Sequence, residues 1–213
     1  MSPLSLRALG AAALMAASAS AKILNLNFED LAISNEQNCG NVTLTNGGDA
    51  YHGVWVSSSF FGHVTVFNTT ETAACSRKKA DAGRLVSPFG YASSAPNVAL
   101  TYTNEIEFQV AGGGSLINKA SFDIAMQFTH QEIAQNNWTV EVNTLQSNFG
   151  DVDHREKFTF SLAKDGPGPW HVATKTDAPS YQFLEVSADI VGAVPTRYPS
   201  IYVDNVVLEN TEK

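Results

Sequence analysis

The chain has 213 residues, enough for one sizeable domain, of which 44% are hydrophobic and only 16% are charged. This hydrophobic content excludes an intrinsically disordered chain, and the low numbers of methionine (3) and cysteine (2) argue against iron–sulfur and disulfide-dense proteins. The formal net charge of −8 excludes nucleic acid as a partner, because such affinity comes from neutralising phosphates.

Residues 1–21 have the order of parts of a secretory signal peptide. One cation, Arg7, precedes the apolar run 8–17, and the small residues Ala19 and Ala21 suit a signal peptidase. The apolar run is shorter than the roughly 20 residues that span a bilayer, so we expect no transmembrane anchor. The sequence therefore predicts a secreted protein whose mature part, residues 22–213, is a single domain.

An oxidising compartment makes Cys39 and Cys75 the one possible intramolecular disulfide. Closing that loop would contribute about 3–4 kcal/mol to the free energy of unfolding. Secretion also allows N-glycosylation at three sequons, which begin at Asn41, Asn68 and Asn137.

Short segments of period-two alternation dominate the mature chain and predict strands. We expect them at residues 23–28, 42–45, 54–57, 64–67, 98–102, 105–110, 120–128, 138–142, 158–162, 170–174, 184–190 and 201–208. Thr103-Asn104 predicts a hairpin, and residues 131–135 allow one helical turn. About a dozen strands joined by Gly- and Pro-rich turns predict an all-β chain, an antiparallel β-sandwich of jelly-roll type.

Catalytic motifs for acyl transfer, phosphate binding and zinc hydrolysis are absent from the sequence. A glycosidase-type carboxylate pair stays open, because only geometry decides which acidic residues of the strands face each other. The candidates for such a pair are Asp123, Glu141, Glu185 and Asp189.

The two ends of the mature chain carry the most specific pattern. Segments 26–31 (LNFEDL) and 201–208 (IYVDNVVL) resemble the opening and closing strands of secreted jelly rolls related to carbohydrate-binding modules. This resemblance implies a structural Ca²⁺ held by Glu29 and Asp204, with Asp30 and Asn205 beside them, because Ca²⁺ prefers oxygen ligands. The alternative is two solvated carboxylates beside a sheet edge.

Segments 53–56 (GVWV) and 94–100 (SAPNVAL) resemble fungal secreted β-sandwich proteins, a group that includes hetero-Diels–Alderases. The resemblance implies a pericyclase that needs no cofactor and couples a tropolone o-quinone methide to a humulene-type sesquiterpene. Such an enzyme holds two small hydrophobic substrates in an aromatic pocket and polarises a developing oxyanion. Candidate pocket walls are Trp55, Phe60, Phe61, Tyr91, Trp138 and Tyr202, and candidate catalytic groups are Gln127, His130 and Arg197.

The alternative function is a secreted carbohydrate-binding or cell-wall-associated module without catalysis. Exposed Trp55, Trp138 or Trp170 would stack on sugar rings while amide and carboxylate side chains bond the hydroxyls. This hypothesis predicts an open face, whereas the pericyclase predicts an enclosed cavity. A structural protein of the cell wall, without a small-molecule site, is the third possibility.

Overall fold

The computed structural model describes residues 21–33, 41–45, 48–58, 62–68, 97–101, 103–112, 115–126, 128, 130–135, 137–148, 151–175, 181–192 and 200–212. The expected leader lies outside these residues, apart from Ala21, and so do Cys39 and Cys75. The described helices are α2 (His130–Gln135) and α3 (Leu162–Asp165). Within this part of the chain, no helix is long and apolar enough to cross a membrane.

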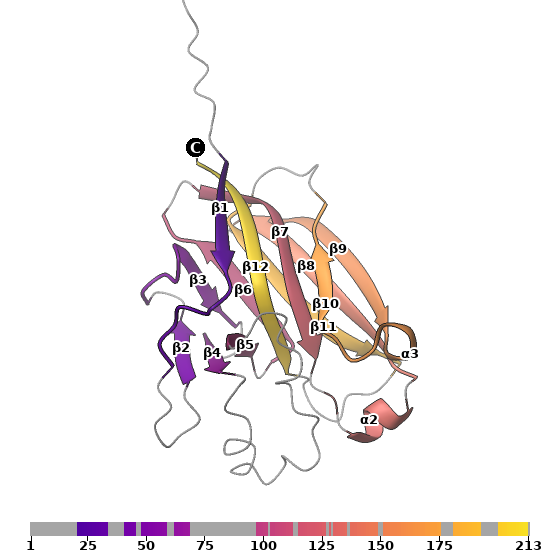
Figure 1. Ribbon diagram of the computed structural model, residues 1–213. Coiled ribbons are helices and arrows are strands. Elements are labelled where there is room, and N and C mark those ends of the chain that lie inside the picture. Colours follow the sequence, from indigo (N-terminus) through magenta and orange to yellow (C-terminus); the bar gives the residue numbers. More distant parts are fainter. Residues whose placement is uncertain are drawn as a thin grey trace, which may run out of the picture.

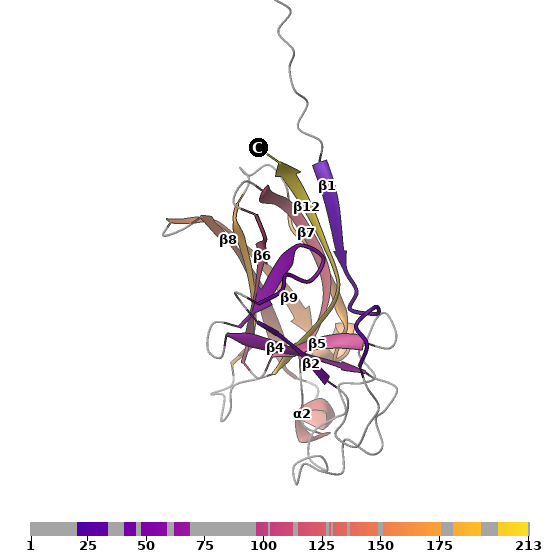
Figure 2. The same cartoon turned by 90° about the vertical axis from the view of Figure 1, so that its left-hand side faces the viewer.

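Twelve described strands form two antiparallel sheets that pack face to face (Figures 1 and 2). The seven-stranded sheet has the order β10-β7-β12-β5-β4-β2, with β1 also paired to β12. Its strands are β1 (Ala21–Leu26), β2 (Asn41–Thr45), β4 (His63–Asn68), β5 (Asn97–Thr101), β7 (Ser115–Met126), β10 (Trp170–Ala173) and β12 (Ile201–Glu212).

The five-stranded sheet has the order β3-β6-β11-β8-β9. Its strands are β3 (Val54–Ser57), β6 (Glu105–Val110), β8 (Thr139–Asn148), β9 (Asp151–Ser161) and β11 (Phe183–Val191). The predicted antiparallel β-sandwich is thereby confirmed, and so is the helical turn at residues 131–135.

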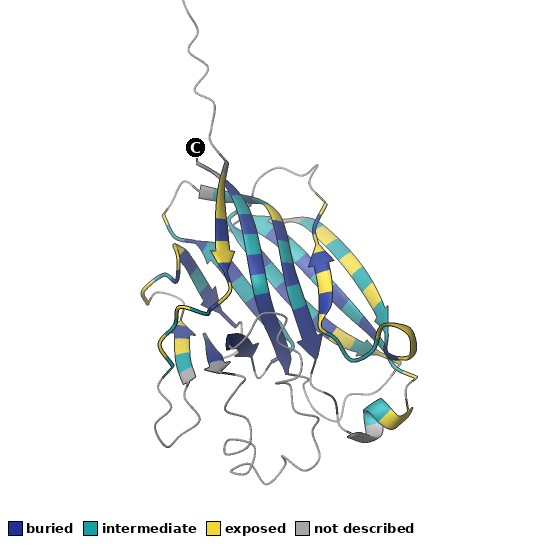
Figure 3. Ribbon diagram, in the orientation of Figure 1, coloured by how far each residue is buried: buried dark blue, intermediate teal, exposed yellow. Residues whose placement is uncertain are grey.

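The core lies between the sheets, and alternation within each strand places residues in it (Figure 3). In β6, Ile106, Phe108 and Val110 are buried while the residues between them are half-buried. Phe122 and Ile124 of β7 enter the same core from the opposite sheet. Burial of such side chains supplies about 1.5–3 kcal/mol each, which makes this interface the main source of stability.

The predicted hairpin at Thr103-Asn104 is wrong, because β5 and β6 belong to different sheets. β5 pairs with β4 on one edge and with β12 on the other, so no edge is left for β6. The Thr103 hydroxyl donates to the carbonyl of Glu105 (3.0 Å) at this crossing point. The turn therefore carries the chain from one layer to the other.

Candidate functional site

The first and last strands meet at the place where the sequence pattern predicts a metal site. β1 pairs with β12 as far as Leu26 opposite Val206, and β5 takes over the same edge of β12, with Ala99 opposite Val203. The backbone of Phe28 turns here at a φ of 61°. This turn directs residues 29–31 toward the beginning of β5.

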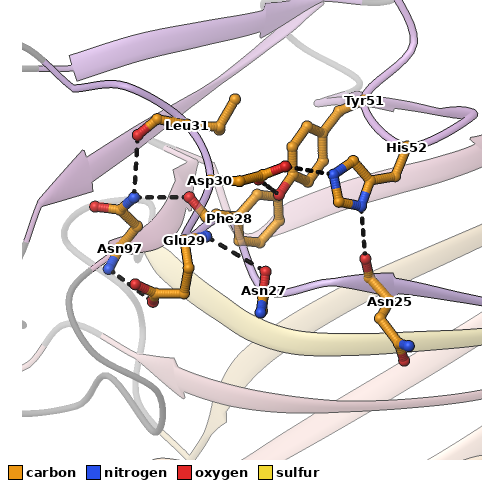
Figure 4. A network of polar contacts seen from close by, with 9 residues as sticks. All are labelled: Asn25, Asn27, Phe28, Glu29, Asp30, Leu31, Tyr51, His52 and Asn97. Atoms are coloured by element: carbon orange, nitrogen blue, oxygen red, sulfur yellow. Dashed lines mark hydrogen bonds and ion pairs between the residues drawn. The ribbon is translucent and has the colours of Figure 1, made fainter.

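Asn97 at the beginning of β5 fastens that turn (Figure 4). Its backbone N–H donates to Glu29 Oε1 (3.1 Å), and its buried side-chain Nδ2 donates to the carbonyls of Phe28 (2.7 Å) and Leu31 (3.4 Å). Asn97 Oδ1 is buried and has no hydrogen-bond partner. Two nitrogen atoms of Asn97 thus tie the turn to β5.

Asp204 lies one residue beyond the β5 pairing of β12 and is buried. It stands opposite Asp123 of β7, and its Oδ1 accepts the backbone N–H of Asn205 (2.8 Å). The Asn205 side chain donates to Asp123 Oδ2 (2.9 Å). In the described part of the chain no three His, Cys, Asp or Glu residues form a group suited to a metal, so the Ca²⁺ site stays a prediction.

A second network joins the same turn to the residues that precede β3 (Figure 4). Asp30 accepts hydrogen bonds from the Tyr51 hydroxyl and from His52 Nε2, the latter at 2.6 Å. The Tyr51 ring stacks between Phe28 (5.4 Å between centroids) and His52 (4.2 Å). We call Asp30, Tyr51 and His52 the clasp, because they join the segment that follows β1 to the residues that precede β3 of the five-stranded sheet.

Both ring nitrogens of His52 face acceptors. Nδ1 lies 3.1 Å from the carbonyl oxygen of Asn25, and Nε2 faces the Asp30 carboxylate. Both ring nitrogens are therefore engaged in contacts within the protein, and we assign the clasp a structural role.

The clasp makes the free energy of unfolding depend on pH in acidic solution. The Tyr51 hydrogen bond, followed by that of His52, lowers the pKa of Asp30 from its ordinary value of 3.8. A lowered carboxylate pKa contributes stability above pH 3.8 that is lost as pH falls through the folded-state value. Asp30→Asn should cost up to about 1 kcal/mol at pH 6, since Asp30 is exposed, and less at pH 2. Urea unfolding at the two pH values measures this, and an equal loss at both would contradict it.

The outer face of the five-stranded sheet combines aromatic and hydrogen-bonding side chains. Register aligns Trp55 of β3, Gln109 of β6 and Phe183 of β11 in one row across the strands. All three are half-buried and point away from the core. Two strand spacings separate Trp55 from Phe183, about 10 Å. The indole Nε1–H of Trp55 donates to the Gly48 carbonyl (3.1 Å), which fixes its orientation.

Carboxylates occupy the next row of this face. Glu107 of β6 lies directly opposite Glu185 of β11, and Glu105 lies two residues from Glu107 on the same face. Burial, followed by the charge of Glu105, raises the pKa of both Glu107 and Glu185. We call this surface the mixed face; its residues are Trp55, Ser57, Glu105, Glu107, Gln109, Asn143, Leu145, Phe183, Glu185 and Ser187.

The crowding of these carboxylates predicts a stabilising substitution. Because its pKa is raised in the fold, the ionised carboxylate lowers the free energy of unfolding above its ordinary pKa of 4.5, and this loss disappears when the group is protonated at lower pH. Glu185→Gln should therefore raise the free energy of unfolding at pH 7 by up to about 1 kcal/mol, the scale of a cross-strand pair. The gain should vanish near pH 4 in chemical unfolding. A gain of the same size at both pH values would point to packing instead of charge.

The register also decides which acidic residues of the strands face each other. Glu185 faces Glu107, and Asp189 faces Glu141 in β8. Asp123 lies in the other sheet, opposite Asp204. Of the four candidates for a glycosidase pair, the structure thus brings together only Asp189 and Glu141, and Glu107 is a partner that the sequence does not single out.

The described aromatic candidates are not gathered in one place. Trp55 is on the mixed face, whereas Tyr202 lies on the outer face of the seven-stranded sheet, buried with Leu100 and Ala125. Trp138 is half-buried and packs against the core just before β8. Trp170 is 4% exposed, so the expectation that it stacks on a sugar is wrong: it packs between Phe128 and Phe160 instead.

The other predicted site residues remain predictions. Phe60, Phe61, Tyr91, Gln127 and Arg197 lie outside the described residues. His130 begins α2. Of the sequon asparagines, Asn41 begins β2, Asn68 ends β4, and Asn137 is exposed before β8.

No protein-family model and no curated protein matches the chain. Among solved structures, a DUF4465 family protein from Bacteroides caccae matches with 9% identity and a TM-score of 0.51, over 90% of this chain and 100% of that chain. A second DUF4465 protein, from Bacteroides ovatus, has 9% identity and a TM-score of 0.46, over 90% and 99%. A family 29 carbohydrate-binding module, solved with mannohexaose, has 12% identity and a TM-score of 0.33, over 90% and 92%.

At this identity a structural match shows the fold alone, and the first of these matches agrees with the β-sandwich. The comparisons support neither the fungal origin nor the hetero-Diels–Alderase activity that the sequence resemblance implies.

Proposed function

We propose that this protein is a non-catalytic, secreted carbohydrate-binding module and that it binds neutral polysaccharide on the mixed face. The observation that carries the proposal is the row of Trp55, Gln109 and Phe183 across adjacent strands beside the Glu107–Glu185 pair. Two aromatic rings flank an amide, so apolar and hydrogen-bonding groups alternate along one surface.

This alternation matches the chemistry of a sugar. A pyranose ring offers C–H groups on its faces and hydroxyls around its edge, so it needs an apolar surface and polar partners together. Trp55 is already oriented by its bond to Gly48, which lowers the entropy lost on binding. The Gln109 amide between the rings can donate and accept hydrogen bonds, and the carboxylates of the next row can accept them.

The charge of the mixed face selects among polysaccharides. The pairing of β6 with β11 places Glu105, Glu107 and Glu185 close together on it. A polyuronate would place further negative charge against these carboxylates and lose affinity. We therefore assign neutral polysaccharides as the ligand class.

Affinity electrophoresis through gels that contain a β-glucan, a mannan, a xylan or the polyuronate alginate tests the proposal. Retardation by at least one neutral polymer but not by alginate is expected. Gln109→Ala should weaken that retardation severalfold, since one hydrogen bond is worth about 1 kcal/mol. Ile23→Ala, an exposed position on the seven-stranded sheet, is the matched control and should leave binding unchanged.

Two outcomes would overturn the proposal. If none of the neutral polymers slows migration, the protein does not bind these polysaccharides and the proposal is wrong. Release of reducing ends from a retained polymer would instead assign hydrolysis to the facing carboxylates and remove the non-catalytic function.

We also propose a structural Ca²⁺ where β1, β5 and β12 meet. Glu29 and Asp204 would hold it, since Ca²⁺ prefers oxygen ligands. Removing such an ion with EDTA should lower the melting temperature by several degrees, and added Ca²⁺ should restore it. Glu29→Gln should abolish this response. A melting temperature that ignores both EDTA and Ca²⁺ would contradict the site.

A further inference from the structure

The inner face of the five-stranded sheet is interrupted by four polar side chains. Thr144 and Gln146 of β8 point into the sandwich, and register places Glu156 and His154 of β9 directly beside them. We call these four residues the inner polar block. On its other side the block adjoins the buried Leu184 of β11, a part of the apolar core.

The inner polar block leads inward from the edge of the sandwich. The exposed fraction of the side chain is 34% for His154 and 11% for Glu156, and Gln146 is fully buried at 0%. β9 and β10 are edge strands of the two sheets. Exposure therefore falls along the block from His154 at this edge to the buried amide of Gln146.

Contacts between β9 and β10 close the edge at two points. Phe160 stacks on Trp170 at one end of the strands (5.1 Å between centroids). At the other end Glu156 Oε1 accepts the backbone N–H of Lys175 (2.8 Å) and lies 3.2 Å from His154 Nε2.

The amide of Gln146 has no partner in the protein. Both Nε2 and Oε1 are buried without a hydrogen bond. Exchanging the two atoms changes nothing, because neither end has a neighbour to bond. Because a buried polar group without a hydrogen bond destabilises the fold, an external partner for this amide would stabilise it.

The unpaired donor and acceptor of the amide define the chemistry of that partner. A metal cation would satisfy Oε1 and leave Nε2 unpaired, and an anion would satisfy Nε2 while meeting the carboxylate of Glu156. A hydroxyl group both donates and accepts, so it serves both ends. We propose that the inner polar block binds a neutral hydroxyl-bearing molecule at Gln146, either a resident water or a small polyol.

This site lies on the opposite side of the sheet from the mixed face and does not depend on polysaccharide binding there. NMR of the ¹⁵N-labelled protein tests it through the side-chain amide protons of Gln146. Their resonances are assigned by their loss in Gln146→Leu, or in Gln146→Met if the first variant does not fold. Spectra are recorded in buffer free of polyol and then with glycerol or myo-inositol added.

Cross-peaks between these amide protons and water that persist in added polyol identify a resident water. If adding polyol replaces the cross-peaks to water with cross-peaks to polyol protons, the site binds a polyol. Amide protons that show cross-peaks to neither would overturn the proposal.

Discussion

Replacing Trp55 with alanine is expected to weaken binding of neutral polysaccharide by at least about 30-fold, corresponding to about 2 kcal/mol. The indole is the largest apolar group of the mixed face, and its ring is held in place by the hydrogen bond to Gly48. Aromatic side chains of this size dominate the energetics of interfaces. Isothermal titration calorimetry with an oligosaccharide of the retained polymer measures the change.

Trp55→Phe separates stacking from hydrogen bonding. It keeps a flat ring but removes the bond to Gly48, so we expect it to retain part of the affinity that alanine loses. Ile23→Ala again serves as the control on the other sheet. Full affinity in Trp55→Ala would place the ligand elsewhere and contradict the assignment of the mixed face.

Replacing Trp170 with alanine is expected to lower the free energy of unfolding by about 3–5 kcal/mol. Trp170 is buried, stacks on Phe160, and donates from Nε1 to the carbonyl of Gly166 (3.2 Å). Its removal leaves a cavity between β9 and β10 that the surrounding strands cannot fill. Thermal unfolding should show a melting temperature lower by about 10 °C or more.

Binding by the folded fraction of Trp170→Ala should equal that of the unchanged protein, because Trp170 does not reach the mixed face. Trp170→Phe, which retains an aromatic ring in the core, should lose less stability. A Trp170→Ala protein that keeps its melting temperature but loses binding would reverse the roles given to the two tryptophans.

The sequence already contained the signal that distinguishes these tryptophans. Val54 and Val56 flank Trp55, so an inward-facing pair of valines places the indole on the outer face. Trp170 and Val172 share a face, because one residue separates them. Alternation therefore predicts the roles correctly when it is applied to each strand.

Period-two alternation does not reveal which strands are neighbours in a sheet. Alternation assigns faces, but pairing partners depend on long-range packing, and this is why the hairpin prediction at Thr103-Asn104 failed although both flanking strands were correct. The clasp was missed for the same reason. Asp30 and His52 are 22 positions apart, and no local pattern indicates that they meet.

At Gln146 the register of the whole strand β8 decides which side chains face inward, against the local sequence pattern. Residues 144–146 place Leu145 between two polar residues, which by itself predicts that the leucine is inside. Val140 and Val142 fix the register of β8, and the strand must then turn Thr144 and Gln146 inward and Leu145 outward. A buried amide at this position follows from the register of the strand.

An NMR titration of the ¹⁵N-labelled protein with an oligosaccharide of the retained polymer is the most direct test of the central claim. The account predicts that the largest shifts occur at the Trp55 indole N–H and at the backbone amides of Gln109 and Phe183, with little change at Ile23. Shifts confined to the seven-stranded sheet, or an unperturbed Trp55 at saturation, would contradict it.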